Sequence, residues 1–267
     1  MFGLALEGGA ARGAYHIGVV KAFYENGYAF DGFVGTSIGA VNAAMLAQDD
    51  LETASRLWLD ISLEQIFEEE ELPFIRLSQI QNWDPFILAK TTSDRRKAVL
   101  KVLRSGVSTD KMRSFLNHCV SEKKIRKSGK DFGLVTLSIN DIKPVELMLD
   151  EIPQNQLIPY IMASTSLPGF RHEKIDGKTY MDGGFCDNCP YGLLLKKGYE
   201  HIIAVRTFNE RIPGLFKKVT DKNRVKVIIP SKNLGNLMSF NSENSRLLID
   251  IGYEDGLRFV QSEEAQI

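Results

Sequence analysis

Short apolar runs and helical stretches alternate along the first fifty residues. Residues 2–6 form an apolar run typical of a buried strand, and residues 13–26 place apolar side chains at helical spacing. A second apolar run at 32–36 leads directly into a helical stretch over 37–47. This order predicts a right-handed β-α-β-α unit with parallel strands at the start of the chain.

Farther along, the pattern becomes mainly helical and then mixed again. Apolar spacing and capping residues predict insertion helices at 51–59, 93–103 and 109–121. The later predicted elements are strands at 133–138, 144–148, 178–181, 202–206 and 225–229 and helices at 154–163 and 244–260, the last with Gly252 as a point where it can break. The fold class expected is therefore α/β, with a mostly parallel central sheet and a helical insertion.

Composition and charge fit one enzyme-sized domain over 1–267. The chain is 43% hydrophobic and 25% charged, and we expect a motif-bearing core at about 2–205, an insertion at about 50–130 and a C-terminal extension at about 206–267. A net charge of −1 gives no basis for a nucleic-acid partner. The apolar runs are too short for a signal peptide or a membrane span, so we expect a cytoplasmic protein.

The cysteines do not indicate a disulfide framework or a metal site. The chain has three of them, an odd number. Cys186 and Cys189 form a C-x-x-C pair, but no second pair or histidine partner accompanies it. We interpret them as incidental thiols in a reducing compartment.

A nucleophile motif lies where the second predicted strand ends. Residues 35–39 read G-T-S-I-G, with Ser37 between Gly35 and Gly39. Such a serine forms a nucleophile elbow, because the glycines allow a sharp turn that exposes its hydroxyl at a helix N-terminus. There the backbone N–H groups favour developing negative charge. The pentapeptide alone is common, so the prediction depends on the strand and helix around it.

A second glycine-rich segment follows the first predicted strand. Residues 7–13 read E-G-G-A-A-R-G, and small residues leave backbone N–H groups open to a ligand. Gly8, Ala10 and Gly13 nearly match a dinucleotide fingerprint. That site also needs an acidic residue after the second strand, where this chain has its nucleophile motif. We therefore favour an oxyanion hole with the N–H groups of Gly9 and Ala10 as donors.

The general base is harder to identify. Ser37, Asp182 and His201 follow the Ser–Asp–His order of α/β-hydrolases, but thirty-six residues cannot supply the strands that precede the nucleophile in that fold. The histidines lie in no supporting motif: they are His16, His118, His172 and His201. A carboxylate remains, and Asp182 is followed by two glycines that allow close approach to another loop. Taken alone, D-G is an ordinary turn dipeptide.

Taken together, these motifs resemble those of the patatin-like phospholipases. The shared blocks are E-G-G-A-A-R-G, G-T-S-I-G and D-G-G, with A-S-T-S-L-P at 163–168 between the last two, and the resemblance extends from Leu4 to about Pro190. It implies a three-layer α/β/α fold. It also implies a catalytic dyad in which Ser37 is the nucleophile and Asp182 the base.

Neighbouring residues are expected to support this dyad. Gly8, Gly9 and Ala10 would form the oxyanion loop, and Arg12 with Gly13 would order it. The elbow and the D-G-G turn would depend on four glycines: Gly35, Gly39, Gly183 and Gly184. The family often carries a third glycine where this chain has Ala10, and we expect the change to be tolerated because the donor there is a backbone N–H.

The expected function is hydrolysis of the acyl ester of a phospholipid or lysophospholipid through an acyl-enzyme. Acyl transfer to a lipid or alcohol and a non-catalytic lipid-binding module stay open as alternatives. No metal or cofactor is expected. Residues 72–88 could be a lipid-contacting lid, although packing onto the core is favoured, and the basic cluster at 123–130 could contact a membrane surface, although a solvated helix end is favoured.

Overall fold

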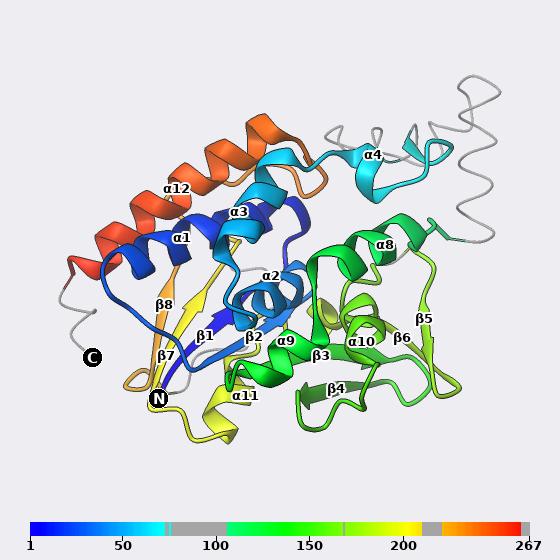
Figure 1. Ribbon diagram of the computed structural model, residues 1–267, viewed down its shortest axis with the longest axis horizontal. Coiled ribbons are helices and arrows are strands. Elements are labelled where there is room, and N and C mark those ends of the chain that lie inside the picture. Colours follow the sequence, from blue (N-terminus) through cyan, green and yellow to red (C-terminus); the bar gives the residue numbers. More distant parts are fainter. Residues whose placement is uncertain (73–74, 76–105, 168, 210–220, 263–267) are drawn as a thin grey trace.

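A central sheet of eight strands organises the computed structural model, which describes residues 1–72, 75, 106–167, 169–209 and 221–262 (Figure 1). The strands are β1 (Phe2–Leu6), β2 (Gly32–Thr36), β3 (Asp131–Ser138), β4 (Lys143–Met148), β5 (Glu173–Ile175), β6 (Lys178–Asp182), β7 (His201–Val205) and β8 (Val225–Ile228). Their order is β5-β6-β3-β2-β1-β7-β8, and β4 also pairs with β3.

Five of these strands, β3, β2, β1, β7 and β8, are parallel, whereas β4, β5 and β6 are antiparallel to their neighbours. The expected α/β class with a mostly parallel sheet is confirmed. The described helices are α1 (Ala14–Glu25), α2 (Ile38–Ala47), α3 (Leu51–Asp60), α4 (Leu63–Ile66), α8 (Asp110–Cys119), α9 (Glu122–Lys127), α10 (Leu157–Ser164), α11 (Tyr191–Lys196) and α12 (Ser242–Val260), with short 3₁₀ turns η1 (Ala10–Gly13) and η2 (Gly183–Phe185).

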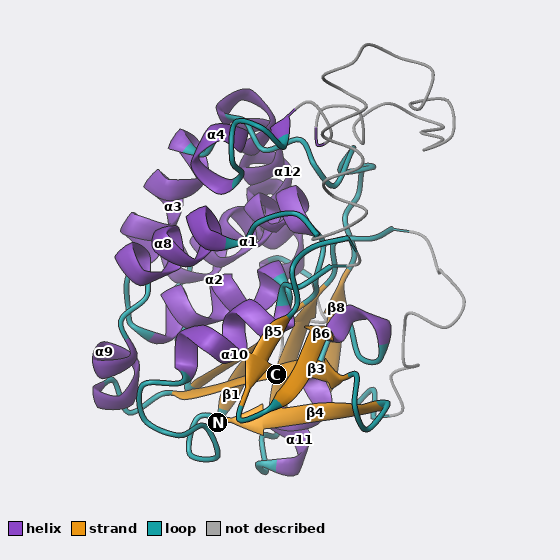
Figure 2. Cartoon of the chain, turned by 90° about the vertical axis from the view of Figure 1, so that its right-hand side faces the viewer, coloured by secondary structure: helices purple, strands orange, loops and turns teal. Residues whose placement is uncertain are grey.

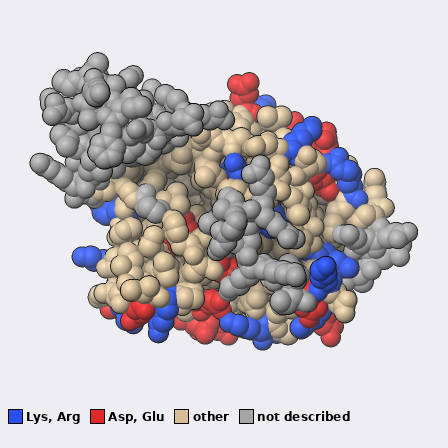
Figure 3. Space-filling view, turned by 180° about the vertical axis from the view of Figure 1, so that it is seen from behind, with Lys and Arg blue, Asp and Glu red and all other residues tan. Residues whose placement is uncertain are grey.

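Most of these helices cover one face of the sheet, and α11 lies on the other (Figure 2). Alternate side chains of a strand point to opposite faces, so Leu4 and Leu6 of β1 belong to the large helical core while Ala5 joins the smaller cluster around Leu194. The resulting order is helix layer, sheet, helix layer. On the face seen in Figure 3, Lys and Arg side chains are interspersed with Asp and Glu over the described residues.

The C-terminal helix α12 packs along α1 and corrects one expectation. The sequence marks Gly252 as a point where this helix can break, yet α12 is continuous from 242 to 260. A Cβ at Gly252 would clash with the carbonyl oxygen of Tyr15, and one at Gly18 would clash with that of Ile249. These glycines let the two helices approach closely, which is a packing role that local propensity does not reveal.

Some elements were not predicted, namely α4, α9, α11 and the short strand β5. The helix expected at 93–103 lies outside the described residues. Most of the basic cluster lies on α9, and Lys130 directly precedes β3, which begins at Asp131. Ser37 lies at the carboxyl ends of the parallel strands, whereas the cluster lies at their amino ends. The cluster and Ser37 are therefore at opposite ends of the strands. No helix among the described residues has the length and apolar character needed to span a bilayer.

Candidate active site

Ser37 stands at a sharp turn between β2 and α2. Its backbone angles, φ 56° and ψ −128°, are unusual for a residue with a side chain, and it is 7% exposed. A Cβ at Gly35 would clash with the backbone of Gly39, and a Cβ at Gly39 would clash with the carbonyl of Leu6. The motif glycines are therefore required by close backbone contact, and the turn has the geometry of a nucleophile elbow.

The sheet register brings Asp182 beside this turn. Thr36, the last residue of β2, is opposite Val135 of β3, and Asp182, the last residue of β6, is opposite the next residue, Thr136. Because β4 pairs with β3 along its other side, β2 and β6 lie end to end on one side of β3 and run in opposite directions, so their carboxyl ends meet. Ser37 and Asp182 are 145 residues apart in sequence and adjacent in the fold.

Asp182 is a buried carboxylate with one committed oxygen. It is 2% exposed, and Oδ1 accepts a hydrogen bond of 2.7 Å from the N–H of Gly184. No donor among the described residues meets the buried Oδ2 with full hydrogen-bond geometry. Burial raises the pKa of Asp182 to about 6, while hydrogen bonding by the Ser37 hydroxyl and the Gly184 N–H lowers it. The Ser37 hydroxyl is thus the nearby donor from which Oδ2 can accept a hydrogen bond. Such catalytic contacts often tighten only when substrate is bound.

The glycine-rich loop passes next to Ser37. The N–H of Gly8 donates to the carbonyl of Asn188 at 2.9 Å, so it is not an available donor. Gly8 is needed for space, because a Cβ would clash with Asn188 Oδ1 and lie 3.2 Å from Ser37 Cβ. Among the described residues no acceptor takes the N–H of Gly9 or Ala10. Of the three residues expected in the oxyanion loop, these two retain free N–H groups.

Arg12 ties this loop to the C-terminal part of the chain. Its guanidinium donates to the carbonyls of Gly235 (2.6 and 3.0 Å) and Thr207 (3.3 Å) and lies 4.6 Å from the ring centroid of Phe208. Gly13 leaves space for Ile38 and Trp58, which a Cβ would approach to 2.6 and 2.9 Å. The expected ordering role of Arg12 is consistent with these contacts.

Glu7 anchors the start of the same loop and was not singled out from the sequence. Fully buried, it accepts from Arg206 Nε at 2.9 Å and from the N–H groups of Thr207 and Phe208 at 2.6 and 3.2 Å. Burial raises the pKa of Glu7, and the charge of Arg206 opposes this rise. Its position directly before the two glycines was the available signal.

An apolar pocket opens at Ser37. Ser37 and Ala10 both line it, so a group held there would lie between the serine hydroxyl and the glycine-rich loop. The other lining residues come from α2, α4, α8 and four loops and are Ile38, Val41, Ile61, Ile66, Phe67, Met112, Phe115, Leu116, Thr165, Leu167, Phe170, Met238 and Phe240. Most of them lie in the insertion or after Pro190, where the motifs gave no guidance.

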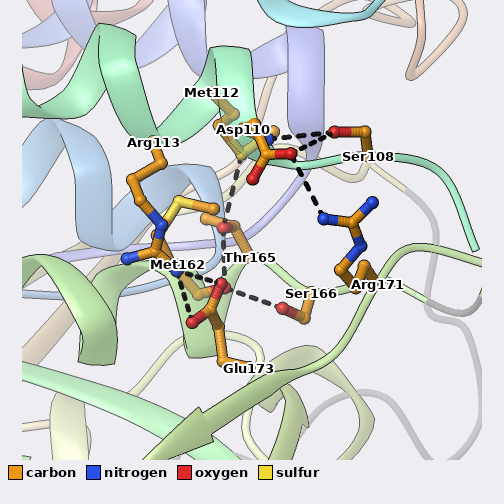
Figure 4. A network of polar contacts seen from close by, with 9 residues as sticks. All are labelled: Ser108, Asp110, Met112, Arg113, Met162, Thr165, Ser166, Arg171 and Glu173. Atoms are coloured by element: carbon orange, nitrogen blue, oxygen red, sulfur yellow. Dashed lines mark hydrogen bonds and ion pairs between the residues drawn. The ribbon is translucent and has the colours of Figure 1, made fainter.

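The α8 wall of this pocket is fixed by ion pairs (Figure 4). Arg113 Nη2 contacts both carboxylate oxygens of Glu173 at 2.5 and 2.6 Å, and Arg171 contacts Asp110 at 3.2 Å. Thr165, which lines the pocket, donates to the carbonyl of Met162. The ion pairs hold α8 against the segment that follows α10.

The four histidines have other surroundings than the pair of Ser37 and Asp182 in the described structure. His16 is buried on α1, where burial lowers its pKa to about 3, and its Nδ1 is 3.2 Å from the Asn42 amide. His118 and His172 are exposed, and His201 stacks on Phe2 at the amino end of β7. None of the four is hydrogen-bonded to Ser37 or Asp182 in the described part of the chain.

The structure describes only part of the segment 72–88 but all of the C-x-x-C pair. Of the segment 72–88, Leu72 and Ile75 are buried, and the rest, including Trp83 and Phe86, lies outside the described residues. Cys186 and Cys189 form no disulfide within the described residues, and their thiols donate weakly to backbone carbonyls. The described residues contain no grouping of His, Cys, Asp and Glu side chains arranged for a metal ion.

Comparison with known proteins finds relatives that are longer than this chain and similar to it over only part of their length. Patatin-like phospholipase domain-containing protein 6 of Mus musculus is 28% identical over 206 residues, covering 76% of this chain and 13% of that protein. Lysophospholipase NTE1 of Kluyveromyces lactis is 26% identical over 208 residues, covering 76% and 12%. The uncharacterized protein YjjU of Escherichia coli is 24% identical over 222 residues, covering 81% and 55%. The chain thus spans about an eighth of the first two relatives and about half of the third.

The fold and the sequence agree on the family. The crystal structure of VipD from Legionella pneumophila superposes with a TM-score of 0.59 at 15% identity, covering 97% of this chain and 66% of that one, which shows a shared fold. The family model described as patatin-like phospholipase matches residues 4–195. Because this match covers well over half of the sequence and includes the elbow, the glycine-rich loop and the D-G-G turn, the chain belongs to the patatin-like phospholipase family.

Proposed function

We propose that the chain is a lipid acyl hydrolase that cleaves the carboxylic ester of a phospholipid or lysophospholipid through an acyl-serine intermediate. The observation that carries this proposal is the position of Ser37 between the buried carboxylate of Asp182 and an apolar pocket. Family membership and the name of the yeast relative, a lysophospholipase, support the substrate class.

The first half of the reaction transfers the acyl group to the enzyme. Oδ2 of Asp182 takes the proton from Ser37 Oγ as the oxygen attacks the ester carbonyl carbon. The tetrahedral oxyanion accepts hydrogen bonds from the free N–H groups of Gly9 and Ala10. When the intermediate collapses, the leaving alcohol oxygen takes the proton from Asp182, and the acyl group remains on Oγ.

Water completes the cycle. Asp182 removes a proton from a water molecule that attacks the acyl-serine, and the second tetrahedral intermediate releases the fatty acid as Ser37 Oγ regains a proton. A pKa of about 6 suits this role, because the carboxylate is mostly ionised at neutral pH and is a stronger base than an exposed aspartate.

The pocket explains why a lipid is the expected substrate. Its walls are formed almost entirely by aliphatic and aromatic side chains, and Ser37 is part of the lining. An acyl chain buried there is transferred from water to an apolar surface, which contributes favourable binding energy roughly in proportion to the area covered. A polar acyl donor would lose its hydration without compensation.

Labelling with a serine-reactive fluorophosphonate, read by intact mass, tests the nucleophile. We expect one adduct on the wild-type chain and none on Ser37→Ala, together with loss of ester hydrolysis in that variant. His201→Ala and His172→Ala should keep most activity. A panel of lipid classes, assayed with and without an alcohol acceptor, then separates hydrolysis from acyl transfer. Full activity in folded Ser37→Ala would refute the proposal.

A further inference from the structure

The backbone of Ser37 needs an external support. A residue with a side chain at φ 56° and ψ −128° is strained, and such a conformation persists only where the surroundings enforce it. Helix α2 engages the carbonyl of Ser37, which accepts from the N–H groups of Ala40 and Val41. The N–H of Ser37 points out of the helix and must be satisfied by another part of the chain.

Ser164, the last residue of α10, provides that contact. Its Oγ accepts the N–H of Ser37 at 2.9 Å and donates to the carbonyl of Val135 at 2.7 Å. The proton positions follow from chemistry, because a carbonyl can only accept and a backbone N–H can only donate. The hydroxyl of Ser164 therefore cannot rotate without breaking one of the two bonds.

The anchor at the other end of this relay is the strand that also holds Asp182. Val135 is opposite Thr36 in the sheet, and its neighbour Thr136 is opposite Asp182. Ser164 is completely buried, so water cannot replace its hydroxyl. A single side chain thus fixes the nucleophile's backbone relative to the strand that sets the position of the base.

We propose that Ser164 is a positioning residue for the attack of Ser37 on the ester: its hydroxyl holds the Ser37 backbone so that Oγ is directed toward Oδ2 of Asp182. This inference rests on the proposed role of Ser37 as nucleophile. Loss of the hydroxyl leaves the buried N–H of Ser37 without an acceptor and lets the elbow relax, which moves Oγ away from the carboxylate while the apolar pocket keeps its shape.

Ser164→Ala tests the proposal against Ser138→Ala as a matched control. Ser138 is also a fully buried serine that accepts one hydrogen bond and donates another, but both of its bonds are with Asp141 in the β3–β4 turn. On a short soluble ester, Ser164→Ala should lower kcat roughly 10²-fold with KM little changed, since small displacements of a reacting group cost about that much. Ser138→Ala should lower the melting temperature comparably and leave kcat unchanged.

Two readouts separate positioning from a general loss of structure. The rate of fluorophosphonate labelling at Ser37 should fall with kcat, and this measurement does not depend on which ester is the natural substrate. The pH midpoint of kcat/KM should move above that of the wild type, because the Ser37 hydroxyl lowers the pKa of Asp182 and would be misaligned. A Ser164→Cys variant keeps a donor and acceptor at the same place, although the thiol is larger and bonds more weakly than the hydroxyl, and should give intermediate rates.

The outcomes are distinct. Absence of labelling and hydrolysis in the wild type would overturn the proposed function itself. If the wild type is active and a folded Ser164→Ala variant keeps kcat and the labelling rate within about threefold of the wild-type values, the role of Ser164 is overturned. Equal losses in both alanine variants would overturn it as well. If Ser164→Ala does not fold, Ser164→Cys decides: an unchanged kcat in the folded cysteine variant refutes the inference.

Discussion

Asp182→Asn should abolish catalysis and stabilise the protein at the same time, with a gain that depends on pH. Asp182 is a charged group held in a fully buried site, where ionisation is unfavourable. Asparagine has nearly the same shape, keeps an oxygen for the N–H of Gly184 and never ionises. Activity should fall nearly to that of Ser37→Ala, because an amide cannot accept the proton.

The sign and size of the stability change follow from the pKa of Asp182. Its pKa rises from 3.8 in the unfolded chain to about 6 in the folded protein, so between these values the folded state binds more protons and stability falls as pH rises. At 1.36 kcal/mol per pH unit, the charged carboxylate lowers the free energy of unfolding by about 3 kcal/mol at pH 8 and about 1 kcal/mol at pH 4.5. The advantage of the asparagine variant should therefore grow by roughly 2 kcal/mol across this range.

Urea unfolding of both proteins at pH 4.5, 6 and 8 measures this difference directly. Asp141→Asn is the control of opposite sign: Asp141 is exposed, and its pKa is lowered first by a hydrogen bond from Lys178, so its removal should reduce stability at neutral pH. In the wild type, kcat/KM should rise with pH and level off above about 6. A stability difference for Asp182→Asn that does not change with pH would refute the desolvation argument.

Three other changes test the loop, a turn and the pocket. Gly9→Ala should lower kcat by about 10²–10³-fold, because its Cβ would collide with Thr207 Oγ1 and displace an oxyanion donor; near-normal kcat would place the hole elsewhere. Ile142→Asn should stabilise the fold by about 1 kcal/mol in thermal unfolding, since the isoleucine is 85% exposed and has φ 51°, a conformation that asparagine adopts more readily. Phe115→Trp should shift the preference among ester substrates toward shorter acyl chains by narrowing the pocket, and an unchanged chain-length profile would contradict the assignment of its lining.

Local pattern was enough for the elements around the motifs. The strands at β1 and β2 and the helices after them were predicted closely, because apolar spacing and glycine turns are properties of short segments. Gly252 was misinterpreted for the same reason: a glycine in a helix resembles a breaker until the helix packed against it is known. The strand β5 has only three residues, too few for a periodic signal.

The sequence by itself determined the family, the α/β class and the elbow at Ser37, since each is encoded in contiguous residues. Tertiary structure decided which distant groups meet there. Asp182 reaches Ser37 because β6 runs antiparallel to β2 along β3, and the Ser164 hydroxyl reaches it because α10 ends over the same strand. The commitment of the Gly8 N–H to Asn188 and the composition of the pocket arise in the same way. These contacts depend on strand register and helix packing between segments over a hundred residues apart, and no local pattern specifies either.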